Sequence, residues 1–535
     1  MSYEFLNRRD LLKQAALSTL ALRTGHSIPQ LSAPVSSAVS STEKRAINAL
    51  QLEPFVDPLP LPQLLPTTGH WTAGNVPLFN ITMREIRVRM HRDLAPTRLW
   101  SYGPEAIGPM LEARSHEGLA VEWHNQLPLR HFLPIDYSLH GAGRELPESR
   151  AVVHLHGGRT PATDDGYPES WYAPGKSRVC HYPNRQDATM LWYHDHAMGT
   201  SRLNLYAGMV GVYLLRDAHE DSLNLPAGRY ELPLILYDRI FDHDGQLFYP
   251  VSAVPEHPWM DEVVGDAMLV NGRVQPFQQV EPRRYRLRLL NAANARFFRL
   301  GLSNGLPLLQ IGADQGLLPV PVRLTTLLLA PGERADVIVD FAAVRGERVV
   351  LTNGAFQMMQ FRVGSSPTED KSHVPETLLP VARLAETSAA RARQMTLNEF
   401  KDPAGNAMVM LLNRTPWHMP VSEVAKLGST EIWSLVNLTD DTHPIHLPHV
   451  RFQVVDRRSF DRDLYLLQHA TLRFTAPALE PHPNESGWKD VVQCPPNMVT
   501  RIHISFAGYP GRYLWHCHVQ EHEANDMMRP YDIVK

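Results

Sequence analysis

Two segments that lie far apart in the chain carry the same pattern of residues. Residues 191–196 read LWYHDH and residues 514–518 read LWHCH, so both place a His-x-His pair after a short apolar run, with Asp195 where the second copy has Cys517. Such a run is typical of a buried β-strand. The repeat predicts that the chain contains two copies of one β domain, of which only the second kept a sulfur ligand.

The rest of the chain favours strands over helices. Segments such as 81–90, 285–290 and 348–351 combine alternating and β-branched residues and end near Gly, Pro or Asn. The 44 prolines in 535 residues are about 8% of the chain, above the usual ~5%, as expected where many turns join short strands. We therefore predict an all-β protein of three β-sandwich domains, at 45–222, 228–365 and 394–535, with a linker at 366–393.

The first 44 residues differ from the rest. Arg8 and Arg9 precede a short apolar stretch at 15–22 and small residues at 36–38. This pattern is typical of a twin-arginine export signal. A membrane span needs about 20 apolar residues, and no segment of the chain has them. We predict an export signal and flexible segment at 1–44, a periplasmic or extracellular location, and no membrane span.

Composition narrows the function. The 52 basic and 56 acidic residues give a net charge of −4, unlike the basic surface of a nucleic-acid-binding protein. Three cysteines exclude a disulfide-built scaffold, whereas 26 histidines point to a metal site made of imidazoles. Cys180 and Cys494 are either buried free thiols or a disulfide between the first and third domains.

Ten of the histidines fall into four clusters. A single His-x-His pair is weak evidence, because two histidines on one face of a strand are often ordinary surface or core residues. Four clusters in two distant pairs would need four coincidences, so we interpret them as metal ligands. They are His154 and His156; His194 and His196; His443, His446 and His449; and His516, His518 and His522.

The last cluster indicates which metal is bound. Cys517 precedes His522 by five residues and Met527 by ten. Together with His443 they make the ligand set of a blue-copper site, whereas zinc does not use the thioether. Because side chains alternate along a strand, Cys517 faces one side and its two histidine neighbours face the other. This predicts one metal in front of the strand and a multi-metal cluster behind it.

Longer motifs around these clusters resemble a known family. HLHGG at 154–158, LWYHDHAM at 191–198, HPIHL at 443–447 and WHCHVQEHEANDMMRP at 515–530 are similar to the multicopper oxidases, and most similar to their bacterial spore-coat laccase and bilirubin oxidase branch. The likeness extends from about residue 50 to the C-terminus. It implies three cupredoxin-like Greek-key domains, with a copper cluster between the first and the third.

The resemblance also implies four coppers and a role for each ligand. The type 1 copper is held by His443, Cys517, His522 and Met527, the type 2 copper by His154 and His446, and the type 3 pair by His156, His194, His196, His516 and His518. Asp165 and Glu523 match acidic positions beside the cluster and would relay the protons that oxygen reduction consumes. Without the resemblance, Asp165 is a turn residue before Gly166 and Glu523 is a surface charge.

One ligand position departs from the family. Pro448 stands where a type 3 histidine belongs, and His449 follows it directly. Proline has no metal-binding side chain. A shift by one residue turns His449 to the opposite face of a regular strand, unless a bulge at Pro448 redirects it. The eighth cluster histidine therefore depends on such a bulge.

The leading interpretation is a copper-dependent oxidase of laccase type. It would oxidise phenols, aromatic amines or bilirubin-like donors by one electron at a time and reduce dioxygen to water, as a monomer with no nucleic-acid partner. The alternatives are a copper-binding relative whose oxygen reduction is impaired by Pro448, a cuprous-ion oxidase for copper tolerance, and a zinc hydrolase. The 18 methionines are scattered rather than gathered in an insertion, which disfavours the cuprous-ion oxidase. Cys517 paired with Met527 disfavours the zinc hydrolase.

Overall fold

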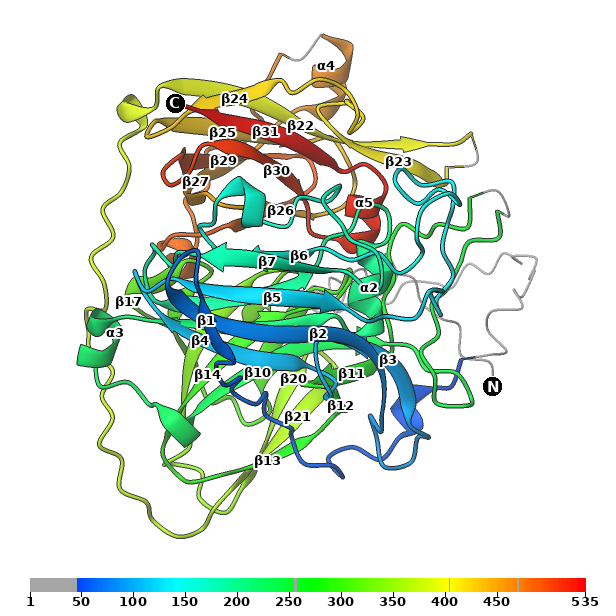
Figure 1. Cartoon of the computed structure of the whole chain (residues 1–535). Coiled ribbons are helices and arrows are strands. Elements are labelled where there is room, and N and C mark those ends of the chain that lie inside the picture. Colours follow the sequence, from blue (N-terminus) through cyan, green and yellow to red (C-terminus); the bar gives the residue numbers. More distant parts are fainter. Residues whose placement is uncertain (1–45, 255–256, 404, 469–470) are drawn as a thin grey trace, which may run out of the picture. The chain divides into compact units, whose positions relative to one another are not determined.

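The computed structural model describes residues 46–535, apart from 255–256, 404 and 469–470. Most of its regular structure is β-strand (Figure 1). The segments predicted as strands overlap β2 (Val76–Val88), β14 (Arg284–Asn291) and β20 (Arg348–Asn353). Among the described residues, no helix has the length and apolar character needed to cross a bilayer. The predicted export signal at 1–44 lies outside the described residues.

The first set of strands forms two sheets. One has the order β1-β2-β5-β7, with β3 paired to β2, and the other has the order β4-β9-β8-β6. Each contains a parallel pair, β2 with β5 and β4 with β9, so the chain crosses between sheets instead of running as a simple meander. The bounds are β1 (Gly69–Trp71), β3 (Thr97–Ser101), β4 (Gly108–Arg114), β5 (Leu119–Asn125), β6 (Val153–His156), β7 (Ser177–Tyr182), β8 (Thr189–Asp195) and β9 (Val210–Arg216).

The middle set also forms two sheets, drawn in green in Figure 1. Their orders are β12-β11-β10-β14-β19-β16-β17 and β13-β21-β20-β15-β18. Leucines of β14 such as Leu287 and Leu289 are fully buried in the core. The bounds are β10 (Glu231–Arg239), β11 (Ala267–Val270), β12 (Arg273–Val274), β13 (Phe277–Val280), β15 (Phe298–Leu302), β16 (Leu308–Ala313), β17 (Gly316–Leu324), β18 (Leu327–Leu329), β19 (Arg334–Asp340) and β21 (Phe356–Val363).

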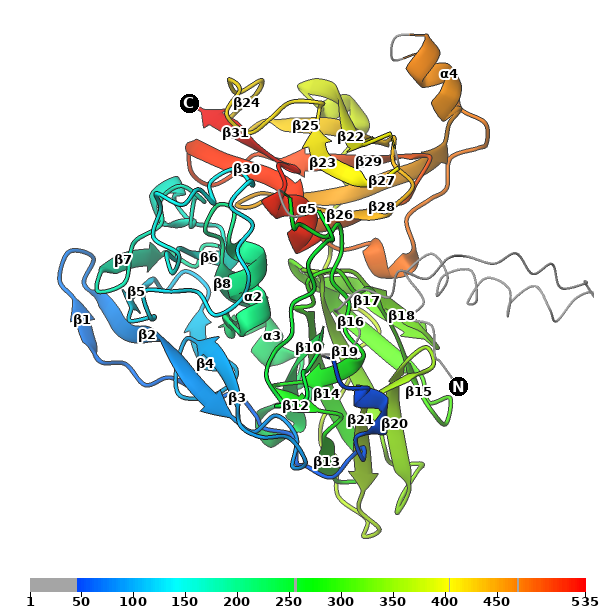
Figure 2. The same cartoon turned by 90° about the vertical axis from the view of Figure 1, so that its right-hand side faces the viewer.

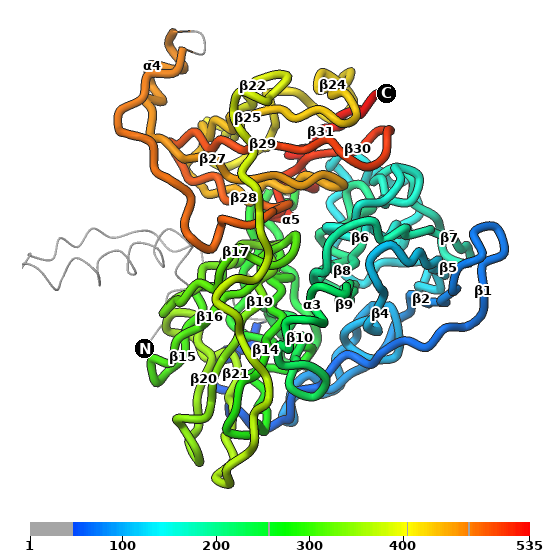
Figure 3. The backbone as a smooth tube through the Cα atoms, turned by 90° about the vertical axis from the view of Figure 1, so that its left-hand side faces the viewer, coloured from blue at the N-terminus to red at the C-terminus, as the bar shows by residue number. Residues whose placement is uncertain are grey.

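The last set follows a long connection. Between β21 and β22 (Arg391–Lys401) the chain has no strand and runs as an extended trace (Figure 3). The two sheets beyond it have the orders β23-β22-β25-β29-β27 and β24-β31-β30-β26-β28. Their bounds are β23 (Ala407–Leu412), β24 (Glu423–Lys426), β25 (Thr430–Asn437), β26 (His443–His446), β27 (Arg451–Ser459), β28 (Val491–Cys494), β29 (Met498–Ser505), β30 (Gly511–Cys517) and β31 (Met528–Val534).

Helices are short and few among the described residues. α2 (Ser201–Ala207) and α5 (Gln520–Ala524) follow the two repeated His-x-His segments and lie against each other (Figure 2). The others are α3 (Ala218–Ser222), α4 (Arg462–Leu467) and the 3₁₀ turns η1 (Ala49–Gln51), η2 (Ala162–Asp164), η3 (Gly228–Tyr230), η4 (Glu386–Ser388) and η5 (Pro483–Glu485). The prediction of an all-β fold is confirmed.

Strand pairing brings the histidine clusters together two by two. In the first set, β6 and β8 are antiparallel and place His154 opposite His194. In the last set, β26 and β30 are antiparallel and place His446 opposite His516. Directly opposed side chains in an antiparallel pair are about 4.5–5.5 Å apart at Cβ, so each register puts imidazoles side by side.

Candidate metal centre

Cys517 and two histidines converge in the last set of sheets. Cys517 ends β30, His443 begins β26, and His522 lies in α5. The Cys517 Sγ lies 3.5 Å from His443 Nδ1 and 3.6 Å from His522 Nδ1, and the two Nδ1 atoms are 3.2 Å apart. All three side chains are buried. One sulfur and two imidazole nitrogens at these distances fit the His₂Cys set of a trigonal blue-copper site.

Met527 and Thr439 lie beside this triangle. The Met527 carbonyl accepts a hydrogen bond from the Cys517 N–H at 3.0 Å, and its own N–H donates to the His522 carbonyl at 3.0 Å. The Thr439 hydroxyl lies 2.7 Å from His443 Nε2 and so fixes the imidazole with Nδ1 toward the sulfur. The buried Met527 is therefore tied through its backbone to two of the ligands that it was predicted to join.

Behind this site, six histidines face one another in pairs. Each pair joins the first set of sheets to the last. The pairs are His154 and His446 (Nε2 to Nε2, 3.5 Å), His196 and His516 (Nε2 to Nε2, 3.5 Å), and His156 and His518 (Nδ1 to Nε2, 3.2 Å). Imidazole nitrogens this close together suit three metal positions, each of which takes one ligand from the first set of sheets and one from the last.

His194 lies beside the paired histidines and can supply a further nitrogen, because ligand atoms of His154, His156 and His194, one from each, lie within 4.8 Å of one another. The His194 Nδ1 lies 2.9 Å from the Asp195 carbonyl, which leaves Nε2 for another partner. That Nε2 is buried and has no hydrogen-bond partner among the described residues. The His194 ring lies 5.8 Å from the His156 ring and 5.5 Å from the His518 ring. A buried nitrogen left without a partner is costly, so the arrangement fits a bound metal.

Burial keeps the cluster histidines neutral. It lowers the pKa of His154 and His446 to about 3 and the pKa of His196 to about 4, because a charged imidazolium loses its hydration in the interior. The same cause lowers the pKa of the other four, which are His156, His194, His516 and His518, well below the usual value. Neutral imidazole is the form that binds a metal.

Stripped of metal, the protein is expected to lose stability as the pH falls from about 6.5 to about 4. In that window the unfolded chain binds protons on histidines that the folded chain keeps neutral. The free energy of unfolding therefore decreases on acidification by about 1.4 kcal/mol per pH unit for each such histidine. Denaturant titrations of chelator-treated protein at about pH 7, 6 and 5 measure this slope.

Glu523 has the opposite effect on stability. Burial raises its pKa to about 8, so from about pH 4.5 to about pH 8 the folded chain holds a proton that the unfolded chain releases. The contribution of Glu523 to the free energy of unfolding therefore falls as the pH rises through that range. Glu523→Gln is the control, and its free energy of unfolding should decrease slightly more steeply on acidification than that of the wild type. Burial also raises the pKa of Asp165, Asp195 and Glu521, so these carboxyls act in the same direction as Glu523. The seven cluster histidines outnumber these four carboxyls, so the histidines dominate. A free energy of unfolding that does not change on acidification would contradict this prediction.

Glu523 lies beside one histidine pair. Its carboxylate accepts a hydrogen bond from the Ser201 hydroxyl at 2.8 Å. The same carboxylate lies 3.6 Å from His196 Nδ1 and 3.5 Å from His516 Nδ1, on the rings' far side from the facing Nε2 atoms. Glu523 is buried, so it is not a surface charge. It can hold a proton next to the cluster at neutral pH.

Asp165 lies beside the His154/His446 pair. Its carbonyl lies 2.5 Å from His154 Nδ1, and its carboxylate accepts a hydrogen bond from the Thr160 hydroxyl at 2.7 Å. Burial raises the pKa of Asp165 well above its usual value. Both acidic residues named from the sequence therefore contact cluster histidines.

His449 is not brought to the other histidines. β26 ends at His446, and its pairing with β28 and β30 shows no register shift, so the bulge considered at Pro448 does not form. His449 takes a left-handed φ of 70° and stacks on Tyr513 with ring centroids 4.2 Å apart. Its Nε2 accepts a hydrogen bond from the Tyr509 N–H at 3.1 Å. The groups of three or more metal-binding side chains in the described part of the chain do not include it.

Asp490 belongs to the centre and was missed from the sequence. Its Oδ1 lies 3.2 Å from His156 Nε2, and its carbonyl lies 2.8 Å from His446 Nδ1. Burial would raise the pKa of this carboxyl, but Arg334 outweighs burial and holds that pKa below the usual value. In the sequence, Asp490 ends the segment GWKD at 487–490, which resembles the multicopper oxidases but does not indicate that its aspartate contacts metal ligands.

The remaining cysteines are not bridged. Cys180 and Cys494 are both buried free thiols, and burial raises the pKa of each to about 12. Of the two possibilities left open by the sequence, the structure shows the free thiols. Neither thiol ionises near neutral pH, so neither is a reactive nucleophile.

Comparisons with known proteins agree with this arrangement. Sequence profiles described as multicopper oxidase match residues 144–220 and 386–535. The laccase of Bacillus subtilis (strain 168) is 44% identical over 514 residues, which cover 90% of this chain and 99% of that protein. The multicopper oxidase LPR2 of Arabidopsis thaliana is 34% identical over 92% of this chain and 94% of its own length.

Solved structures show the same fold. A laccase from Pediococcus acidilactici superimposes with a TM-score of 0.74 at 26% identity, covering 90% of this chain and 95% of its own. The McoA multicopper oxidase of Aquifex aeolicus gives a TM-score of 0.73 at 25% identity, covering 90% and 100%. The fold, the four histidine clusters and these relatives together place the chain in the multicopper oxidase family, on the branch of the bacterial spore-coat laccases.

Proposed function

We propose that the protein is a laccase-type oxidase that takes single electrons from phenols, aromatic amines or bilirubin-like donors and passes them to dioxygen, which is reduced to water. The observation that carries this function is the end of β30, where Cys517 faces the trigonal site and its neighbours His516 and His518 face the cluster. Copper bound at these positions, one type 1, one type 2 and two type 3, would supply the one-electron redox chemistry.

The backbone at Cys517 connects the two sites. His516 and His518 are its covalent neighbours, and the Cys517 carbonyl also lies 3.0 Å from His516 Nδ1. An electron that enters at the sulfur therefore has two covalent routes and one hydrogen-bonded route to the cluster. All of these groups are buried, which keeps water away from the path.

Two carboxyl groups would handle protons. Reducing one dioxygen to water consumes four protons as well as four electrons. Glu523, with its pKa raised to about 8 by burial, carries a proton at neutral pH and can release it toward the His196/His516 pair. Asp165 can do the same beside His154, whose Nδ1 lies 2.5 Å from the Asp165 carbonyl and 3.7 Å from its carboxylate.

A surface cavity beside the trigonal site is our proposed binding site for the organic donor. It has a volume of about 470 Å³, within the range of small-molecule sites. Two lining residues, Asn525 and Asp526, lie between His522 and Met527 in the chain. The remaining lining residues are Ser138, Leu139, His140, His257, Met408 and His418.

Oxygen uptake with a phenolic donor tests the proposed function. Copper-loaded protein is expected to consume one dioxygen for every four donor molecules oxidised and to release no hydrogen peroxide. An oxygen electrode and a peroxidase-coupled assay measure the two quantities, and protein treated with a chelator is the control. Donor oxidation that yields peroxide, or no oxygen uptake at all, would rule the proposal out.

A second candidate is a copper-binding relative with impaired oxygen reduction. It is favoured by the His196/His516 pair, to which the structure adds no third histidine. A metal held by two imidazoles is bound less firmly than one held by three. The copper content of the purified protein separates the candidates, because four per chain supports the full oxidase and three supports the relative.

Three further features are proposed. The Arg8-Arg9 pair supports export by a twin-arginine signal to the periplasm or beyond. The protein would act as a monomer on small molecules. Division into three cupredoxin-like domains at 45–222, 228–365 and 394–535 is supported by the three pairs of sheets.

A further inference from the structure

We propose that Arg334, which lies in the middle set of strands, is a positioning residue that fixes the ligands of two copper positions at once by holding Asp490. The middle set supplies none of the cluster histidines, because β19 and its neighbours carry no cluster residue. The inference rests on the proposed function, since it takes His156 and His446 as copper ligands. The middle sheets would then take part in the reaction by orienting copper ligands that the other two sets supply.

Asp490 contacts ligands of two different pairs. Its Oδ1 lies 3.2 Å from His156 Nε2, and its carbonyl lies 2.8 Å from His446 Nδ1. The two rings also stack, with centroids 3.7 Å apart and planes 7° from parallel. One residue thus sets the rotation of both imidazoles, and with it the direction of the nitrogens that face His518 and His154. Such partners fix the tautomer and orientation of metal-binding histidines.

Arg334 fixes Asp490 in turn. Its Nη1 donates to Asp490 Oδ1 at 2.6 Å and its Nη2 to Oδ2 at 2.5 Å. The remaining donors reach backbone carbonyls, of Gly332 at 3.0 Å, Asp314 at 2.9 Å and Met190 at 3.2 Å. A guanidinium with this many fixed partners holds a carboxylate in one plane, which the single charge of a lysine cannot do.

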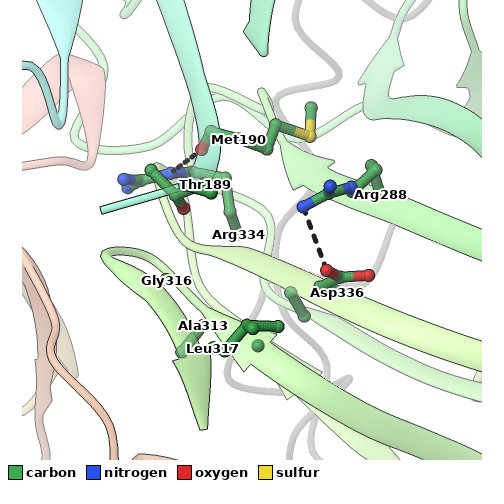
Figure 4. Close-up of a pocket in the computed structure, with 11 residues that line it drawn as sticks. Thr189, Met190, Arg288, Ala313, Gly316, Leu317, Arg334 and Asp336 are labelled. Carbon is green, nitrogen blue, oxygen red and sulfur yellow. Dashed lines mark hydrogen bonds and ion pairs between the residues drawn. The ribbon is translucent and has the colours of Figure 1, made fainter. Parts of the chain in front are cut away.

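The surroundings leave Arg334 no room to move. The cavity next to it has a volume of about 10 Å³, space for one water molecule at most. Figure 4 shows Arg334 hydrogen-bonded to the carbonyl of Met190 beside this cavity, with the Arg288–Asp336 ion pair near it. Arg334 itself is 2% exposed. A displacement of the Arg334 guanidinium would therefore require the surrounding backbone to shift.

Gly332 explains why the middle set of strands can approach the cluster histidine His518 so closely. It has a φ of +84°, and a Cβ at this position would lie 2.8 Å from the His518 ring. Only glycine satisfies both the backbone conformation and the contact. The turn before β19 therefore lies against His518, while Arg334, two residues later, holds Asp490, which contacts His156, the residue that faces His518.

The matched control is Arg286, in β14 of the same sheet. It is also 2% exposed and makes a similar two-pronged contact with a buried carboxylate, from Nε to Asp336 Oδ1 at 2.9 Å and from Nη2 to Oδ2 at 2.5 Å. Its ionic partners are Asp336, Glu220 and Glu231, and the structure gives neither Arg286 nor Asp336 a contact with a cluster histidine. Loss of Arg286 should cost stability without altering the ligands.

The test compares copper-loaded Arg334→Met, Arg334→Lys and Arg286→Met with the wild type. We expect Arg334→Met to keep the type 1 absorption, to change the hyperfine splitting of the type 2 copper in electron paramagnetic resonance, and to slow oxygen reduction about 10- to 100-fold. Arg334→Lys should give the same spectral change to a smaller extent. Arg286→Met should have the wild-type resonance spectrum although it unfolds at a lower denaturant concentration.

A double variant, Arg334→Met with Asp490→Leu, separates positioning from folding. Removing both charges of a buried pair restores stability that loss of one charge takes away. His156 Nε2 still lacks its carboxylate partner, and His446 loses the carboxylate 3.6 Å from its Nδ1 and keeps only the backbone carbonyl of residue 490. We expect a stable protein whose type 2 signal remains altered. A wild-type signal in the double variant, or the same altered signal in Arg286→Met, would overturn the inference. A wild type without any type 2 signal would instead overturn the proposed function, and the inference with it.

Discussion

Cys517→Ser is expected to abolish the blue colour and the oxidation of donors while leaving the fold intact. The colour of a blue-copper site arises from charge transfer between a thiolate and copper, and a serine hydroxyl cannot supply it. Cys517 is also the residue at which all three proposed electron routes begin, so donor oxidation should fall to the background level. The substitution changes one atom in a buried site, and the triangle keeps both imidazoles. Visible absorption and donor turnover of the copper-loaded variant measure the two effects.

Cys494→Ser is the matched control. Cys494 is buried and free like Cys517, and it lies directly opposite His443 in the pairing of β26 with β28. Its side chain is absent from the groups of metal-binding residues in the described chain. The control should stay blue and active. A colourless wild type, or a blue Cys517→Ser protein, would remove the basis for a type 1 site.

The ligands that follow strand periodicity could be predicted from the sequence. Alternation alone places Cys517 on one face of β30 and its histidine neighbours on the other, and the structure has both sites where that rule puts them. The partners of those histidines could not be read in this way. That His516 lies opposite His446 depends on the pairing of two strands distant in the sequence, and pairing is decided by the whole fold.

The charged residues around the cluster were the least predictable. Arg334 and Asp490 look like ordinary surface charges in a sequence, because lone arginines and aspartates are rarely buried. They are buried here because each is the other's partner and because backbone carbonyls and Gln315 complete their hydrogen bonds, which only the tertiary structure brings together. Glu523 was found only through its likeness to a family motif, and without that likeness it was read as a surface charge.

The loop after β26 shows where a local rule fails. The sequence argument extended the strand through Pro448 and asked whether a bulge could redirect His449. The strand instead stops at His446, and the chain turns so that the Pro448 carbonyl accepts a hydrogen bond from the Tyr531 hydroxyl at 2.7 Å. His449 then fits between aromatic side chains rather than imidazoles. Proline, which cannot donate to the ladder, accounts for the early end of the strand.

His449→Ala is accordingly expected to leave copper content and oxygen reduction unchanged. It removes the stacking on Tyr513, so it should lower the free energy of unfolding by about 1 kcal/mol or more. Copper analysis, oxygen uptake and denaturant unfolding of the variant check the three statements. The left-handed φ of residue 449 is not changed by this substitution, so the loop should keep its path.

Pro448→His is the complementary change and has the larger expected effect on the cluster. The family resemblance puts a type 3 histidine at this position, where its imidazole would be a third nitrogen for the His196/His516 pair, which has two. We expect the copper at this pair to be lost to a chelator more slowly than in the wild type and oxygen reduction to become several-fold faster, since a third ligand binds the metal more tightly. Removing proline also returns an N–H to the backbone, so Pro448→Ala is the control for that effect and should lose copper to the chelator as fast as the wild type. A His449→Ala protein that loses copper, or a Pro448→His protein that holds copper no more firmly than the wild type and reacts more slowly, would show that His449 already serves the cluster and that our description of this loop is wrong.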